Sequence, residues 1–286
     1  MKRFLIGALV AGSLFATGAI AESVPNTLGK IKAAKVINVA FADNALPFSF
    51  VGTNNEPAGY SIDLCKRVIA GIGQAVGQPN LKVNWLAGST PERLRMVATG
   101  KADLECGNTS QTLARLASVD FSGLIFIDAG GILIRADSSF NSMADLDGKK
   151  IAVLKGTTTE ARLNAIVQKH LVNTRVVTVG DANEALAMLE SGSVDAYAGD
   201  KIKLVGLAAQ AKEPGKFVML AEEISFEPYA LALPRGDSAL RLEVNRALTQ
   251  VYLSDDIEAI FVRWLGVLGR PTALLSAMYL LYSIPE

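Results

Sequence analysis

The chain has 286 residues, half of them hydrophobic, and its 28 basic and 28 acidic side chains leave no net charge. A chain without a basic excess offers no electrostatic reason to expect a nucleic-acid partner. One histidine and two cysteines cannot supply the usual zinc or Cys–His catalytic sets, so we expect no metal and no other cofactor.

The first residues have the pattern of a secretory signal. Lys2 and Arg3 precede an uncharged apolar run that ends in Ala-Ile-Ala at positions 19–21, and small residues at this spacing are typical of a signal peptidase site. We therefore expect residues 1–21 to be removed after Ala21 and the slightly acidic mature chain to be periplasmic. An uncleaved anchor is the alternative, but the apolar run is short for a membrane span.

The first part of the mature chain alternates strand and helix patterns. Leu64, Val68, Ile72 and Val76 are spaced four residues apart, which makes one apolar helix face that can pack on a sheet. The strand and helix patterns follow one another in βαβα order, which is typical of an α/β fold with a largely parallel sheet. The expected strands are 35–41, 81–87 and 102–106, and the expected helices are 61–76 and 91–100.

A second unit of the same kind begins after Gly148. Its expected strands are 151–154, 174–179 and 195–199, with helices between them. Two apolar stretches flank this unit and are expected to be crossovers between the units, at 123–138 and 225–238, and helices within 239–265 return to the first unit.

This pattern predicts two lobes, each a mostly parallel sheet flanked by helices. Lobe one comprises residues 22–130 and 225–286, and lobe two comprises residues 131–224. A chain of this size exceeds the usual single core. We expect the ligand site in the cleft between the lobes, where such sites commonly lie.

Cys65 and Cys106 are the two cysteines. An even pair in an exported chain enters an oxidising compartment, which favours a disulfide between them. Two buried thiols packed as small apolar groups are the alternative.

The chain also carries short motifs in a specific order. They are LPFSF at 46–50, GYSIDLC at 59–65, ECGNTSQTLAR at 105–115, GTT at 156–158, ESG with Asp195, and the ending RWLGVLGRPTALLSAMYLLYSIPE. Together they make the chain resemble the periplasmic solute-binding proteins of polar amino-acid ABC importers (bacterial extracellular solute-binding proteins, family 3), closest to the glutamate/aspartate-type branch. The resemblance covers nearly the whole mature chain and implies the two-lobed type II periplasmic-binding-protein fold, a monomer, and a membrane permease as partner.

Arg115 follows a turn rich in serine and threonine, and the planar fork of an arginine suits a carboxylate. The resemblance implies that Arg115 grips the α-carboxylate of an amino acid, helped by donors from Asn108 and Ser110. The alternative is an arginine on a helix surface that pairs with Asp120.

The turn at 156–160 opens a helix and presents free N–H groups that suit an anion. The resemblance implies that Thr157 and Thr158 close lobe two over the same carboxylate. Thr157 and Glu160 also fit an ordinary capping box, which is the alternative.

An α-ammonium group needs acceptors, and the resemblance assigns this role to Asp200. A solvated charge paired with Lys201 or Lys203 is the alternative there. Phe48 and Phe50 are expected to form an aromatic wall over the aliphatic part of the ligand, and burial in the core is their alternative.

The residues expected to face the ligand side chain depart from the family pattern. The glutamate/aspartate-type proteins have an arginine where this chain has Ala42. Thr90 and Arg93 match family positions that face the side chain, although their segment also fits a helix start. The match at Thr90 and Arg93 implies a polar side chain that is acidic or bears an amide. Asp43 and Asn44 instead suit a polar or cationic group, so the resemblance leaves the side chain open.

The function expected from the resemblance is an exported, non-catalytic receptor that closes around an L-amino acid and delivers it to an ABC permease. An enzyme on the same fold, such as a cyclohexadienyl dehydratase, is one alternative and would need an acid such as Glu105, Glu160 or Asp200. An amino-acid sensor for a membrane receptor is the other.

Overall fold

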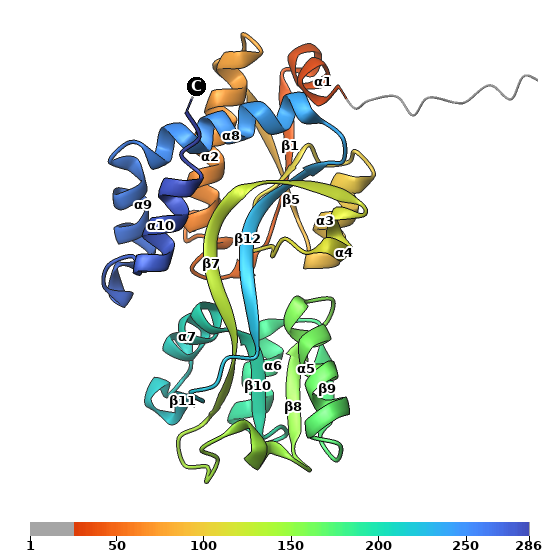
Figure 1. The fold of residues 1–286 in the computed structure, drawn as a ribbon, viewed down its shortest axis with the longest axis vertical. Helices are drawn as coiled ribbons and strands as arrows, with labels where there is room; N and C mark the ends of the chain where they lie inside the picture. Colours follow the sequence, from red (N-terminus) through yellow and green to blue (C-terminus); the bar gives the residue numbers. More distant parts are fainter. Residues whose placement is uncertain (1–25, 286) are drawn as a thin grey trace, which may run out of the picture.

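The structure, a computed structural model, describes residues 26–285. The predicted signal peptide at 1–21 lies outside these residues. Figure 1 shows an upper and a lower lobe connected by two long strands, β7 (Val119–Arg135) and β12 (Ser225–Pro234). One sheet runs through both lobes in the order β5-β1-β6-β12-β7-β10-β8-β9, and β11 (Phe217–Met219) pairs with β7.

Lobe one is the upper lobe in Figure 1. Its central strand β1 (Val36–Phe41) runs parallel to β5 (Lys82–Ala87) and to β6 (Leu104–Glu105). Its other elements are α1 (Thr27–Ala34), α2 (Tyr60–Ala75), α3 (Thr90–Ala98), α4 (Leu113–Leu116), α8 (Ser238–Tyr252), α9 (Asp256–Leu265), η3 (Gly266–Leu268), α10 (Ala273–Leu281) and a small sheet of β2 (Asn44–Ala45), β3 (Ser49–Val51) and β4 (Pro57–Ala58).

Lobe two repeats the parallel arrangement. Its strand β8 (Lys150–Leu154) runs parallel to β9 (Arg175–Val179) on one side and to β10 (Ala196–Asp200) on the other. Its helical elements are η1 (Met143–Leu146), α5 (Thr158–His170), α6 (Ala182–Glu190), α7 (Lys201–Gln210) and η2 (Pro214–Lys216).

The apolar helix face predicted at Leu64, Val68 and Ile72 lies on α2, and all three side chains are fully buried. They belong to a core built from residues before Asp128 and after Pro228, whereas the two cores of lobe two are built from residues between Gly131 and Ser225. The hydrophobic effect therefore stabilises each lobe through its own core.

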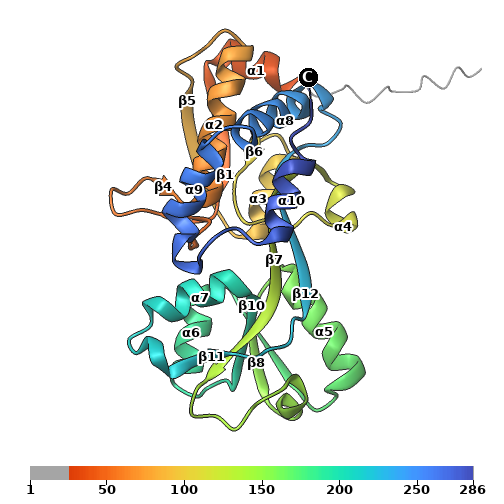
Figure 2. The same cartoon turned by 60° about the vertical axis from the view of Figure 1, so that its left-hand side comes forward.

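The crossovers hold the lobes together through backbone pairing. β7 pairs antiparallel with β12 from Val119 opposite Pro234 to Gly130 opposite Ser225, and then pairs with β10. A Cβ atom on Gly130 would lie 2.1 Å from Ser225 Oγ, so a larger residue there would displace the Ser225 side chain. Helix α10 packs against β7 from lobe one (Figure 2).

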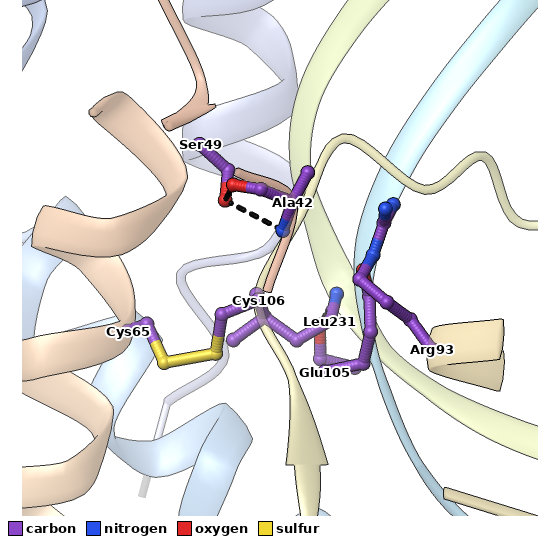
Figure 3. Close-up of a disulfide and its surroundings, with 8 residues drawn as sticks. Ala42, Ser49, Cys65, Arg93, Glu105, Cys106 and Leu231 are labelled. Atoms are coloured by element: carbon purple, nitrogen blue, oxygen red, sulfur yellow. Dashed lines mark hydrogen bonds and ion pairs between the residues drawn. A yellow bond between two sulfur atoms is a disulfide. The ribbon is translucent and has the colours of Figure 1, made fainter. Parts of the chain in front are cut away.

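Cys65 and Cys106 form a disulfide with an S–S distance of 2.03 Å, which confirms the predicted bridge. It joins α2 to the residue that follows β6 (Figure 3). With a sequence separation of 41 between the cysteines, loop-closure entropy gives a stabilisation of about 4 kcal/mol. The bridge also anchors the start of the segment that carries Asn108, Ser110 and Arg115.

Several elements were not predicted from the sequence. These are α1, the small sheet, α7 and α10. Helix α7 begins directly after β10 with no loop between them, so it lacks the turn signal by which a helix start is recognised. Among residues 26–285, no helix is both long and apolar enough to cross a membrane.

Candidate ligand-binding site

A cavity of about 360 Å³ lies between the lobes. It receives side chains from both lobes and brings together most of the predicted site residues. The predicted residues that line it are Ala42, Asp43, Asn44, Thr90, Arg93, Asn108, Ser110, Arg115, Thr157, Thr158 and Asp200. Residues that were not predicted also line it, among them Lys155, Asp181 and Lys203.

Arg115 reaches from lobe one toward lobe two. Its Nη1 donates to the carbonyl of Ser110 at 2.7 Å, and its Nη2 donates to the carbonyl of Gly156 at 3.4 Å. Burial lowers the pKa of Arg115, while the nearby carboxylates of Glu105, Glu227 and Asp200 oppose that shift. The alternative pair with Asp120 is wrong, because Asp120 lies 3.6 Å from Arg241 instead.

Asp200 is a buried carboxylate at the end of β10 that lines the cavity. It accepts hydrogen bonds from Tyr229 Oη at 2.7 Å, Asn108 Nδ2 at 3.0 Å and Thr159 Oγ1 at 3.1 Å. Its alternative partner Lys201 pairs with Glu223 at 3.0 Å. Within residues 26–285 no ion pair of Asp200 is found, so its negative charge is available to a cationic ligand group.

The side chain of Asp200 does not cap helix α7. Asp200 is the N-cap residue of α7, but its side chain makes no capping bond. Asp128 on β7 accepts from the backbone N–H of Ile202 at 3.3 Å instead. Burial and the charge of Asp200 raise the pKa of Asp128 to about 7.

Thr157 and Thr158 both line the cavity, and both use their hydroxyl groups within the protein. Thr157 accepts from the Glu160 N–H at 3.1 Å, so one half of the alternative capping box is present. Glu160 in turn accepts from the Gly156 N–H at 2.6 Å. Thr158 Oγ1 donates to Glu227 at 2.5 Å.

Glu227 on β12 was missed by the sequence reasoning. It is fully buried and accepts from the hydroxyl groups of Ser110, Thr158 and Ser225. Burial first, and then the charge of Asp200, raise the pKa of its carboxyl group. An acidic residue within an apolar crossover strand was the available signal, because a buried carboxylate needs specific partners.

Arg93 lines the cavity, but its donors are used inside lobe one. Its Nε donates to Glu105 Oε1 at 2.7 Å, and its other nitrogens donate to Gly88, Thr109 and Thr90 at 2.8, 3.2 and 3.3 Å. Arg93 and Glu105 are both almost fully buried and lie near the disulfide in Figure 3. The buried charge of Glu105 therefore offsets that of Arg93, and the predicted helix start is also present at Thr90.

The segment after β1 supplies one wall of the cavity. The Ala42 N–H donates to Ser49 Oγ at 3.0 Å, and Ser49 Oγ donates back to the Ala42 carbonyl at 2.8 Å (Figure 3). Asp43 and Asn44 are exposed and line the cavity. Asn44 Nδ2 donates to Asp181 across the cleft, so it links the two lobes directly.

Phe48 and Phe50 do not line the cavity, so the expectation that they form an aromatic wall over the ligand is wrong. Phe48 is fully buried and packs edge-to-face against Phe126 and Tyr229, with ring centroids 5.0 and 5.1 Å away. Phe50 packs against Trp264 at 5.6 Å. Both rings therefore stabilise lobe one rather than contact the cleft.

The two lobes, the paired crossovers and the charged cleft define a two-lobed solute-binding protein. Residues 37–267 match the bacterial extracellular solute-binding proteins, family 3, and the chain belongs to this family. The fold prediction of a type II periplasmic-binding-protein architecture and the prediction of a non-enzymatic solute-binding family are both confirmed.

Two curated relatives and one solved structure illustrate the similarity. The L-glutamate/L-aspartate-binding protein of Pseudomonas aeruginosa is 31% identical, over 91% of this chain and 86% of that protein. The glutamate/aspartate import solute-binding protein of Escherichia coli is 28% identical, over 90% and 85%. An ancestral arginine-binding protein bound to arginine superposes with a TM-score of 0.73 at 27% identity, covering 81% of this chain and 99% of that chain.

Proposed function

We propose that this protein binds an L-amino acid in the interlobe cavity and delivers it to the membrane permease of an ABC importer. The observation that carries the proposal is the presence of Arg115 and Asp200 on the same cavity. A guanidinium group suits the α-carboxylate and a carboxylate suits the α-ammonium. The relatives named for glutamate and aspartate binding support the same class of ligand.

The ligand side chain is proposed to be polar, and acidic or amide groups are the leading candidates. The cavity near Ala42 lacks the family arginine, and Arg93 is offset by Glu105. Lys155 and Lys203 line the same cavity and make no ion pair within residues 26–285. They are the cations on lobe two that an acidic side chain would meet.

Transport requires the cleft to open and close. Among the hydrogen bonds that join the lobes in this structure are those of Arg115 with Gly156, Asn108 with Asp200, and Asn44 with Asp181. We propose that β7 and β12 act as the hinge and that a bound amino acid stabilises the closed form. Export to the periplasm and action as a monomer belong to the same proposal.

The enzyme alternative is weaker because each candidate acid already has structural partners. Glu105 pairs with Arg93, and Glu160 accepts from the Gly156 backbone. Asp200 accepts three hydrogen bonds. All three carboxyl groups therefore already serve structural contacts, which an acid that protonates a leaving group would have to give up.

The test is a thermal-shift panel on protein that has been unfolded and refolded to remove bound solute. The panel contains the twenty L-amino acids and prephenate. A ligand at about 100 times its Kd stabilises the folded state by about 2.7 kcal/mol. A shift for a few polar amino acids is expected, whereas a shift for prephenate alone would contradict the proposal and favour the dehydratase.

A further inference from the structure

Glu227 forms hydrogen bonds with residues on both walls of the cavity. Its Oε2 accepts from Ser110 of lobe one and from Thr158 of lobe two, and its Oε1 accepts from Ser225 Oγ at 2.6 Å. The side chain is fully buried, and no ion pair involving it is found within residues 26–285. A buried carboxylate held by hydroxyl groups alone is neutralised by protonation more readily than one paired with a cation.

The hydroxyl protons of Ser110 and Thr158 limit what the cavity offers to an anion. Each hydroxyl group has one proton and two lone pairs. While Glu227 is ionised, both protons point to Glu227, and only lone pairs remain for the cavity that Ser110 and Thr158 line. Lone pairs repel a ligand carboxylate placed beside them.

A proton on Glu227 reverses this arrangement. The neutral carboxyl group donates its O–H to one of the two hydroxyl groups, and that hydroxyl group can then turn its own proton into the cavity. Burial and the charge of Asp200 already raise the pKa of Glu227, which favours proton binding at this position.

The charges around Glu227 decide the effect of a ligand. Asp128 on β7 is its cross-strand partner, and Asp200 lies at the end of β10. Tyr229 follows on its own strand, and Arg115 faces it from α4 with the opposite charge. A ligand carboxylate at Arg115 compensates that favourable charge and adds a negative one, which raises the proton affinity of Glu227. The ligand ammonium at Asp200 acts in the opposite direction, but the carboxylate is the nearer group in this proposal, because Ser110 and Thr158 bond Glu227 and also line its subsite.

We propose that Glu227 is a positioning residue that takes up a proton when a ligand carboxylate enters the cleft, and that it thereby turns the hydroxyl of Ser110 or Thr158 toward that carboxylate. This inference rests on the proposed amino-acid binding. Glu227 does not line the cavity itself. Its protonation state would decide whether the hydroxyl groups beside the ligand carboxylate can donate a hydrogen bond to it.

Titration calorimetry tests the inference directly. L-Glutamate, L-glutamine and L-arginine are each titrated at pH 7 and pH 8 in phosphate and in Tris buffer, whose ionisation enthalpies differ. The buffer dependence of the heat gives the number of protons bound. The native protein should take up as much as about one proton per ligand, and its affinity should fall with rising pH by at most about tenfold per unit.

Glu227→Gln is the decisive variant, because its amide retains one donor and one acceptor without a charge. It should bind fewer protons than the native protein, and at pH 8 its affinity should equal or exceed the native value. Glu227→Ala should bind more weakly than Glu227→Gln. Glu160→Gln is the matched control, since Glu160 bonds the Gly156 N–H and not Ser110 or Thr158, and it should keep the native proton count.

Asp128 can also bind a proton in this pH range. The quantity to compare is therefore the difference in proton uptake between the native protein and Glu227→Gln. In an Asp128→Asn background with Glu227 intact, proton uptake should persist, and this arm does not depend on the folding of Glu227→Gln. Equal proton counts in the native protein and Glu227→Gln, or no uptake in Asp128→Asn, overturn the inference alone. Failure of every amino acid in the thermal-shift panel overturns the proposed function, and the inference with it.

Discussion

Two arginines face the same cavity from lobe one, and they use their donors differently. Arg93 is 2% exposed and bonds Glu105 and three neighbouring oxygen atoms. Arg115 bonds two backbone carbonyls, one of which lies in the opposite lobe. The contrast teaches that two cations lining one cavity can differ in how far their charge is already used. Arg93 forms a direct ion pair with a buried acid, and within residues 26–285 no such pair is found for Arg115.

The largest expected effect is on the stability of the Arg93 pair. Arg93→Ala leaves the buried Glu105 without its cation, and breaking a buried pair from one side costs about 3–5 kcal/mol. Urea unfolding at neutral pH measures this loss. A double replacement by Met at 93 and Leu at 105 should recover most of it, because no uncompensated charge remains.

A loss much below 1 kcal/mol in Arg93→Ala would show that this pair does not differ from a surface ion pair, and the contrast between the two arginines would fail.

Arg115→Ala should act on binding instead. Removing one partner of a desolvated charged contact costs about 2–5 kcal/mol, so the Kd of the bound amino acid should rise by about 30-fold or more. Isothermal titration measures the Kd, and Arg241→Ala serves as the control because Arg241 pairs with Asp120 away from the cavity. An unchanged Kd in Arg115→Ala would remove this residue from the site.

The buried acids extend the comparison, because Glu105 has a cation partner and Asp128 accepts only from N–H and hydroxyl groups. A folded-state pKa of about 7 for Asp128 lies above the unfolded value of about 3.9. Its contribution to stability is therefore fully present below about pH 4 and is lost as the pH rises through about 7.

Asp128→Asn should reduce this pH dependence, which amounts to at most about 1.4 kcal/mol per pH unit. Unfolding free energies of both proteins at pH 5 and pH 8 measure it. The same slope in both proteins would assign the pH dependence to other groups.

The smallest expected effect concerns the exposed edge of the cleft. Asn44 donates to Asp181 across the lobes, and an exposed hydrogen bond of this kind contributes about 0.5–1.5 kcal/mol. Asn44→Ala should weaken amino-acid binding a few-fold by disfavouring the closed form. Small-angle scattering should show an unchanged radius of gyration at saturating ligand and a larger population of open molecules below saturation.

Local patterns in the sequence predicted the parts of the fold that depend on neighbouring residues. The spacing of Leu64, Val68 and Ile72 predicted the buried face of α2, and the pair Cys65 and Cys106 predicted the bridge. Strand and helix order predicted the parallel sheets, because period and turn signals are local properties.

The remaining features depend on contacts between distant segments. Glu227 meets Ser110 and Thr158 only after β12 aligns with the cleft. Phe48 is buried by rings that come from three other parts of the chain, so no local pattern distinguishes it from a cavity residue. Resemblance to a family supplied Arg115 and Asp200, but it did not supply the partners that decide their availability.

Gly156 sets a mechanical limit on how the protein shuts. Its φ is +75°, and a Cβ atom there would lie 2.2 Å from Pro91 Cγ in the opposite lobe. The absence of a side chain at this one position therefore permits the close approach of the two halves. A single methyl group there would be strained by the positive φ and would push against Pro91, so it would disturb the turn whose carbonyl accepts from Arg115.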